Sequence, residues 1–145
     1  MGQAAIVVVD DTEYVREVIE SMHDRNDYAV YSFANPNDAL AVSENIQIDL
    51  FIFDMVMPKM NGMEVLKRLN VHENLFEVIM ITGKSDGEDS AEAMRLGAFG
   101  VLQKPFSHGE LITSVEYALA SAAAKKQRVG NRLDLGHGNN SEALL

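Results

Sequence analysis

The sequence predicts an α/β protein built on a five-stranded parallel β-sheet, doubly wound with helices on both faces. Short apolar, β-branched runs alternate along the chain with segments whose apolar residues recur at helical spacing. Residues 4–9 and 50–53 are apolar at every position, which is typical of strands buried on both faces of a parallel sheet. Strands that alternate with helices imply right-handed crossover connections, and these place helices on both sides of the sheet.

Three strands and two helices are predicted in the first part of the chain. The strands are residues 4–9, 29–33 and 50–53. The Asn35-Pro36 pair predicts the start of the second helix, because Asn caps helices and Pro suits the first helical position. The first helix is predicted from apolar residues at helical spacing: Val15, Val18, Ile19 and Met22.

The middle of the chain repeats the alternation. The Asn61-Gly62 turn precedes a third helix, whose apolar positions are Met63, Leu66 and Leu69. Residues 78–81 form the fourth predicted strand. A weaker helix is predicted over residues 88–96, ending at Gly97, because glycine readily takes the left-handed conformation that stops a helix.

The last unit consists of a strand at residues 99–102 and a helix that opens at residues 107–110. The sequence Ser-His-Gly-Glu at that opening is a capping box. The helix is predicted to end near Lys126. Its apolar positions are Leu111, Ile112, Val115, Ala118 and Leu119.

The C-terminal segment divides the chain into a folded domain, residues 1–124, and a remainder, residues 125–145. The remainder is rich in Gly and Asn after Lys126 and lacks periodicity. We therefore expect it to contain the end of the last helix and a flexible tail or the beginning of a linker. Lys125, Lys126 and Arg128 are interpreted as favourable charges at a helix C-terminus rather than as a nucleic-acid site.

Composition excludes several classes of function. The chain has 145 residues, the size of one domain, with 12 Lys and Arg against 22 Asp and Glu. The formal net charge of −10 disfavours nucleic-acid binding, and the absence of Cys excludes disulfides, thiol catalysis and Cys-based zinc sites. The N-terminus does not resemble a signal peptide, and no apolar run approaches the roughly 20 residues of a membrane span. A cytoplasmic location without membrane contact is the expectation.

Polar residues follow four of the five predicted strands. Asp10 and Asp11 follow the first, Asp54 the third, Thr82 the fourth and Lys104 the fifth. In an open parallel α/β sheet, ligands bind beyond the carboxyl ends of the strands. If these strands are neighbours, the five side chains converge on one crevice.

The chemistry of this set points to phosphoryl transfer. Helix capping accounts for one aspartate of the Asp10-Asp11 pair, but not for Asp54, which ends the most apolar strand and precedes a loop. Carboxylates gathered in one crevice suit Mg²⁺, which takes oxygen ligands. A carboxylate beside Mg²⁺ can attack a phosphoryl group and form an acyl phosphate. Thr82 and Lys104 supply a hydroxyl and an ammonium group for the remaining phosphoryl oxygens.

The chain resembles the receiver domain of two-component response regulators over roughly residues 4–124. The resemblance rests on the order and spacing of the motifs Asp10-Asp11, Asp54 followed by M-V-M-P-K-M-N-G, Thr82-Gly83 and Lys104-Pro105-Phe106. It implies a chemotaxis-regulator-like, flavodoxin-like fold with strand order 2-1-3-4-5. It also implies a phosphorelay function rather than an enzyme, since receivers catalyse only their own phosphorylation and dephosphorylation.

The resemblance assigns the acceptor and the metal ligands. Asp54 accepts the phosphoryl group from a phosphohistidine on a sensor histidine kinase or a phosphotransfer protein. Asp11 and Asp54 bind Mg²⁺ through their side chains, Val56 binds it through its backbone carbonyl, and Asp10 acts mainly through water. The output is a protein–protein contact or onward phosphotransfer, and the sequence leaves the cognate kinase and the downstream target open.

The resemblance also assigns roles at the ends of the fourth and fifth strands. Thr82 binds a phosphoryl oxygen, and Lys104 pairs with Asp54 and then with the phosphoryl group. The Lys104-Pro105 peptide bond is cis in this family. The sequence departs from the family at Val101, where receivers commonly carry Tyr or Phe, so coupling through a turning ring is absent here.

Two alternative functions compete with this interpretation. Phosphatases of the haloacid-dehalogenase type also use an Asp nucleophile and Mg²⁺, but their strand ends in D-x-D. Here the sequence is Asp54-Met55-Val56, which lacks the second acid, and the chain has no cap domain. A receiver that binds partners without phosphorylation is the other alternative, but every residue of the phosphorylation set is present.

Overall fold

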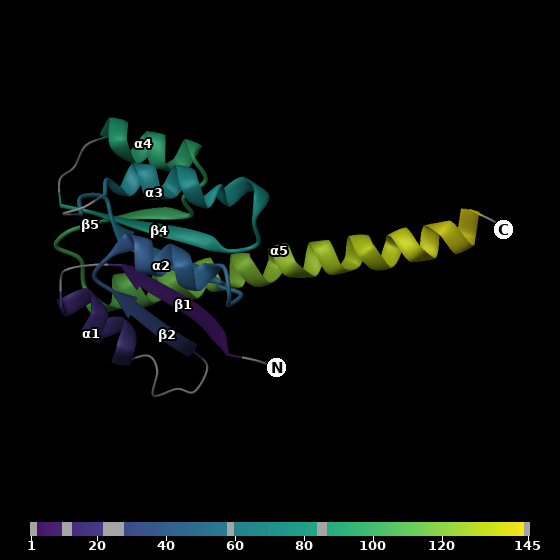
Figure 1. Ribbon diagram of the computed structural model, residues 1–145, viewed down its shortest axis with the longest axis horizontal. Coiled ribbons are helices and arrows are strands. Elements are labelled where there is room, and N and C mark those ends of the chain that lie inside the picture. The colour runs from purple at the N-terminus through teal and green to yellow at the C-terminus, as the bar shows by residue number, and fades with distance from the viewer. Residues whose placement is uncertain (1–2, 10–12, 22–27, 58–59, 84–86, 144–145) are drawn as a thin grey trace.

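The computed structural model describes residues 3–9, 13–21, 28–57, 60–83 and 87–143, and it contains the predicted five-stranded parallel sheet (Figure 1). The strand order is β2-β1-β3-β4-β5, and every neighbouring pair is parallel, which confirms the predicted fold. The strands are β1 (Ala4–Val9), β2 (Tyr28–Phe33), β3 (Leu50–Asp54), β4 (Glu77–Thr82) and β5 (Gly100–Gln103).

Helices cover both faces of this sheet. The helices are α1 (Glu13–Ser21), α2 (Pro36–Ser43), α3 (Gly62–Leu69), the 3₁₀ turn η2 (Val71–Glu73), α4 (Gly87–Arg95) and α5 (His108–Ala143). Alternate residues of each strand point to opposite faces, so the sheet carries two separate apolar cores. Residues of α1 and α5 pack on one face, and residues of α2, α3 and α4 pack on the other (Figure 1).

The central strand β3 contributes buried side chains to both cores. On β3, Leu50 and Ile52 face the α1 and α5 side, whereas Phe51 and Phe53 face the other side. All four side chains are fully buried or nearly so, as the continuous apolar run predicts. The Phe51 ring meets Phe76 edge to face, with ring centroids 4.9 Å apart.

The helix-start and helix-stop signals lie where the sequence predicts them. The Asn35 side chain accepts a hydrogen bond from the Asn37 amide, and Pro36 is the first residue of α2. At the start of α5, the Glu110 amide donates to the Ser107 hydroxyl at 3.0 Å, which is one half of the predicted capping box. Gly97 follows α4 with a φ of +104°.

The end of α5 differs from the prediction. The helix continues to Ala143 instead of ending near Lys126, and its last turns extend away from the globular body (Figure 1). A helix that is already nucleated and packed gains one hydrogen bond for each residue added, so it can extend without an apolar stripe. The Gly- and Asn-rich composition after Lys126 lowers helix propensity and misled the prediction.

The other predicted boundaries of strands and helices differ from those of the structure by at most one residue. For example, β2 begins at Tyr28 rather than residue 29, and β5 runs from Gly100 to Gln103 rather than from 99 to 102. Within the described part of the chain, none of the helices is both long enough and apolar enough to cross a membrane.

Candidate functional site

Three of the predicted site residues meet at the carboxyl ends of neighbouring strands. Asp54 is the last residue of β3, Thr82 is the last residue of β4, and Lys104 follows β5. The Lys104 amide donates to the Thr82 carbonyl at 2.7 Å, which ties the end of β5 to the end of β4. Asp54 and Thr82 are 5% and 7% exposed, so both polar residues are buried at the edge of the sheet.

Asp54 forms an ion pair with Lys104. The Lys104 Nζ lies 2.7 Å from Asp54 Oδ2, across 50 residues of sequence. The other carboxylate oxygen, Oδ1, accepts the Val56 backbone N–H at 3.1 Å. These two donors fix the orientation of a buried carboxylate, as a nucleophile requires.

The loop after β3 returns tightly to Asp54. The Met55 amide donates to the Ile81 carbonyl at 2.7 Å, and the Gly62 amide donates to the Met55 carbonyl at 2.8 Å. Val56 and Asn61 form an isolated antiparallel bridge. The Val56 side chain is 79% exposed, so this residue contributes its backbone, not its side chain, to the site.

Gly62 makes this close return possible. A Cβ atom at Gly62 would lie 2.6 Å from the Asp54 carbonyl oxygen and 2.7 Å from the Met55 Cα. Both neighbours are backbone atoms, so no side-chain rotation can relieve the overlap. The sequence showed Gly62 only as part of a turn, and its role in placing Asp54 was missed because the overlap depends on the path of the loop.

The segment after Lys104 forms a wall beside the ion pair. The Lys104-Pro105 peptide bond is cis, as the resemblance implied. The Phe106 side chain is buried, and its ring centroid lies 6.2 Å from that of Tyr14 on α1. Tyr14, Val15, Lys104, Pro105 and Phe106 line a hollow of about 370 Å³ next to the ion pair.

The predicted metal ligands are only partly visible. Asp10 and Asp11 lie outside the described residues, so their predicted place in the crevice is not tested. Among the described residues, none of the His, Asp and Glu side chains gather in a group of three or more that could hold a metal ion. Asp54 and Val56 carry a carboxylate and a backbone carbonyl, which are oxygen donors of the kind that Mg²⁺ binds.

Comparison with known proteins gives a family match over most of the chain. The family described as "Response regulator receiver domain" matches residues 6–116. The regulatory protein AtoC of Escherichia coli is 33% identical over 122 residues, which are 84% of this chain and 26% of AtoC. The alkaline phosphatase synthesis transcriptional regulatory protein PhoP of Bacillus subtilis is 30% identical over 138 residues, which are 90% of this chain and 58% of PhoP.

Solved structures give the same result. A response regulator receiver domain protein from Clostridium thermocellum superposes with a TM-score of 0.70 at 30% identity, covering 87% of this chain and 98% of that one. The chain therefore spans only part of these two curated regulators but nearly all of that solved receiver domain. With the family match over residues 6–116, the strand order and the buried Asp54–Lys104 pair, this chain belongs to the receiver domain family of two-component response regulators.

Proposed function

We propose that Asp54 accepts a phosphoryl group from a phosphohistidine on a sensor histidine kinase or a phosphotransfer protein. The observation that carries this proposal is the buried Asp54 carboxylate, held by Lys104 at 2.7 Å at the carboxyl edge of the sheet. Thr82, which carries a hydroxyl group, ends the neighbouring strand β4 and so lies on the same edge of the sheet. Family membership supports a role in signalling rather than in the turnover of a small substrate.

In the proposed step, an Asp54 carboxylate oxygen attacks phosphorus, and the phosphorus–nitrogen bond of the phosphohistidine breaks. The electron pair of that bond stays with the histidine ring, and Asp54 becomes an acyl phosphate. The Lys104 ammonium, which neutralises Asp54 before the step, then pairs with a phosphoryl oxygen. The Thr82 hydroxyl binds another phosphoryl oxygen.

A divalent cation is part of the proposal. Asp11, Asp54 and the Val56 carbonyl would hold Mg²⁺, with Asp10 acting through water. A bound Mg²⁺ would supply positive charge that offsets the negative charge of the phosphoryl oxygens. The residues of this chain orient the carboxylate, since the Val56 N–H and the Lys104 ammonium each engage one of its oxygens.

The output of the proposed cycle is a protein–protein contact or onward transfer of the phosphoryl group. The only chemistry assigned to the chain is its own phosphorylation and autodephosphorylation. A cytoplasmic location, where a kinase could reach Asp54, belongs to the same proposal.

Incubation with acetyl phosphate and Mg²⁺, followed by intact-mass measurement, tests the proposal. We expect the wild-type protein to gain one phosphoryl group, and we expect no gain when EDTA removes the metal. Asp54→Asn keeps the size of the side chain but has no carboxylate nucleophile, so it should gain none. A wild-type protein that stays unmodified, or an Asp54→Asn variant modified to the same extent, would contradict the proposal.

A further inference from the structure

Two buried carboxylates lie at the end of the sheet opposite Asp54. Asp49 directly precedes β3, and Glu77 is the first residue of β4. The Glu77 amide donates to the Asp49 carbonyl at 3.0 Å, so the two residues are neighbours at the amino edge of the sheet. Their exposed fractions are 8% and 5%, and the proposed phosphoryl chemistry uses neither of them. Buried carboxylates are costly unless they are paired, so their partners indicate what they do.

The partners of Glu77 come from α5. The Lys125 Nζ lies 3.1 Å from Glu77 Oε1, and it also donates to the Phe76 carbonyl at 2.9 Å. The Ser121 hydroxyl, one turn earlier on the same helix, donates to the other carboxylate oxygen, Oε2. Both oxygens of Glu77 are therefore bound by side chains of a single helix.

The next residue of α5 binds the second carboxylate. The Lys126 ammonium forms an ion pair with Asp49 Oδ1. The other oxygen, Oδ2, accepts the Ala5 backbone N–H at 2.7 Å, which ties the carboxylate to β1 as well. Lys125 and Lys126 thus bind carboxylates at the starts of two adjacent strands. The prediction that these lysines lie at a helix C-terminus is wrong, because α5 continues for 17 residues beyond Lys126, to Ala143.

At its start, α5 packs the fully buried side chains of Leu111 and Val115 against the sheet. The part of α5 nearer to Lys125 has smaller apolar contacts and depends less on them for its register. Its buried positions Ala118 and Ala122 carry only methyl groups, and the surrounding sequence is A-L-A-S-A-A-A. A smooth row of methyl groups resists sliding less than interlocking large side chains do. A slip of one helical turn moves the side chains by about 5.4 Å, which would separate both ion pairs.

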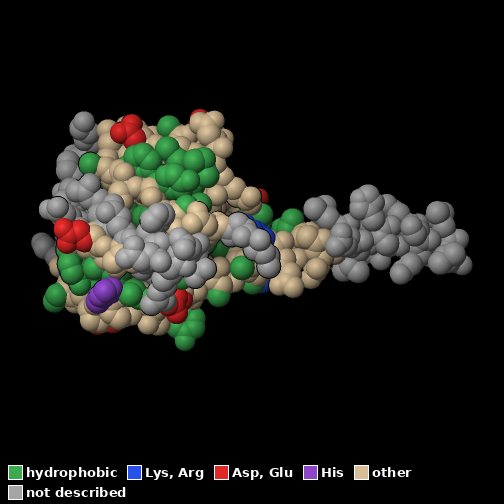
Figure 2. Space-filling model, turned by 90° about the horizontal axis from the view of Figure 1, so that it is seen from below, with side chains coloured by type: hydrophobic (Ala, Val, Ile, Leu, Met, Phe, Trp, Pro, Cys, Tyr) green, Lys and Arg blue, Asp and Glu red, His purple; other side chains and the backbone are tan. Residues whose placement is uncertain are grey.

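We propose that Asp49, Glu77, Ser121, Lys125 and Lys126, here called the base latch, set the register of α5 and hold its extension in one direction relative to the receiver body. Specifying register is a recognised use of buried ion pairs. Figure 2 shows Lys and Arg side chains at the point where α5 leaves the body, and Figure 1 shows the helix running straight on from there. The helix beyond Lys126 therefore moves with the receiver as one rigid piece.

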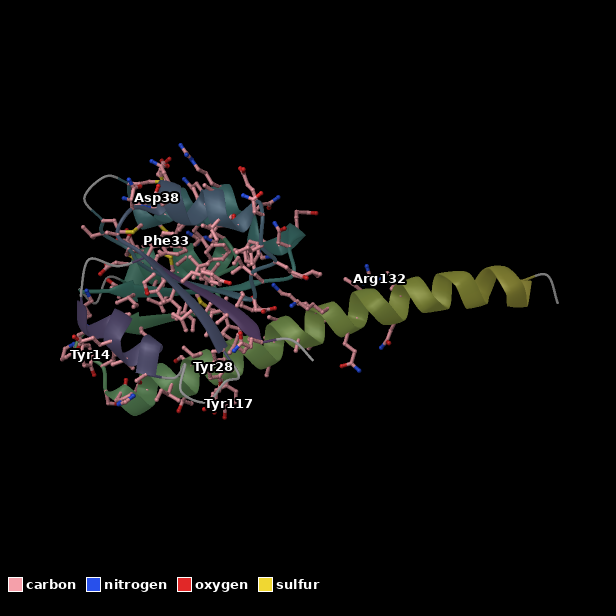
Figure 3. The ribbon with its side chains drawn as sticks, turned by 60° about the horizontal axis from the view of Figure 1, so that its bottom comes forward. Tyr14, Tyr28, Phe33, Asp38, Tyr117 and Arg132 are labelled. Atoms are coloured by element: carbon pink, nitrogen blue, oxygen red, sulfur yellow. The ribbon has the colours of Figure 1, made fainter. Side chains whose placement is uncertain are left out.

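Distances between two spin labels test the base latch on the full chain. The sequence has no Cys, so Asp38→Cys and Arg132→Cys give a single labelled pair. Asp38 lies on α2 in the body and Arg132 on the extension, and both side chains are exposed (Figure 3). We expect one narrow distance distribution for the latched protein. We expect the distribution of the Lys125→Met/Lys126→Met variant to be at least twice as wide.

Two further variants separate the latch from general damage. Lys67→Met/Arg128→Met removes two positive charges from exposed positions of α3 and α5, and its distribution should stay as narrow as that of the parent. Asp49→Asn/Glu77→Gln/Lys125→Met/Lys126→Met removes all four latch charges, so it leaves no buried carboxylate unpaired, and its distribution should be wide. A broad distribution in the parent protein, or a narrow one in either latch variant, would overturn the proposal.

Discussion

At the scale of single residues, the site depends on how closely the backbone approaches Asp54. Among the described residues, the Lys104 side chain and the Val56 backbone N–H hold its carboxylate. The backbone N–H lies close to the start of α3, because the Gly62 amide donates a hydrogen bond to the carbonyl of Met55, the residue before Val56. Gly62, which has no side chain, therefore contributes to the placement of Asp54, the proposed nucleophile.

Gly62→Ala tests this role. The added methyl group would overlap the backbone of Asp54 and Met55, so the loop must shift. We expect the free energy of unfolding to fall by about 1–3 kcal/mol, as for other overpacked positions, and phosphorylation by acetyl phosphate to slow. Chemical denaturation and the rate of mass gain measure the two effects.

Gly87→Ala is the matched control, because a Cβ at Gly87 meets no atom within 4 Å. Its stability and phosphorylation rate should remain close to those of the parent. If Gly62→Ala behaves like this control on both measurements, the loop tolerates the methyl group and Gly62 does not position Asp54.

At the scale of elements, the sequence predicted the strands well because burial on both faces leaves a local signature. The apolar runs of β1 and β3 could be recognised without any knowledge of their neighbours. The site residues at the strand ends followed from the same reasoning, since parallel strands bring their carboxyl ends together. Asp54, Thr82 and Lys104 were therefore predictable as a group.

The contacts of α5 could not be predicted in the same way. Lys126 pairs with a carboxylate 77 residues away, and Lys125 pairs with one 48 residues away. Local sequence offers no sign of such partners, and a pair of lysines beside a Gly- and Asn-rich segment resembles the end of a helix. The length of α5 was missed for the same reason, because extension of a formed helix needs no apolar pattern.

The element β5 carries a further prediction. Val101 is half-buried, pairs in register with Met80 and packs against the core on the side of α2, α3 and α4. Valine has no ring to turn inward and little freedom at χ1, so its side chain cannot change position on phosphorylation as a larger rotating side chain could. Addition of beryllofluoride, a phosphoryl mimic, should therefore change amide exchange more in residues 56–61 than around Val101.

Hydrogen-exchange mass spectrometry with and without beryllofluoride measures this difference. Asp54→Asn, treated in the same way, is the control for effects unrelated to the site. Strong protection localised at residues 99–103 and along 111–119, with unchanged exchange in residues 56–61, would show that β5 and α5 respond without an aromatic ring and would contradict the prediction.

At the scale of the whole molecule, the two ends of the sheet carry different polar groups for different purposes. The carboxyl edge holds Asp54, Thr82 and Lys104, and the amino edge holds the base latch. Both edges use buried carboxylates paired with lysine, and a hollow lies beside the Asp54–Lys104 pair (about 370 Å³) and beside the Asp49–Lys126 pair (about 350 Å³). The Glu77 pair is instead bound on every carboxylate oxygen by α5. The lysine partners at the amino edge all come from α5, whereas Lys104 directly follows β5.

The most direct test of the account is to locate the acyl phosphate chemically. Borohydride reduces an aspartyl phosphate to homoserine, so reduction after treatment with acetyl phosphate and Mg²⁺ marks the residue that was phosphorylated. Peptide mass mapping should find homoserine at position 54 and at no other aspartate. Homoserine at position 10 or 11, or its absence from a protein that has gained a phosphoryl group, would contradict the assignment of Asp54 as the acceptor.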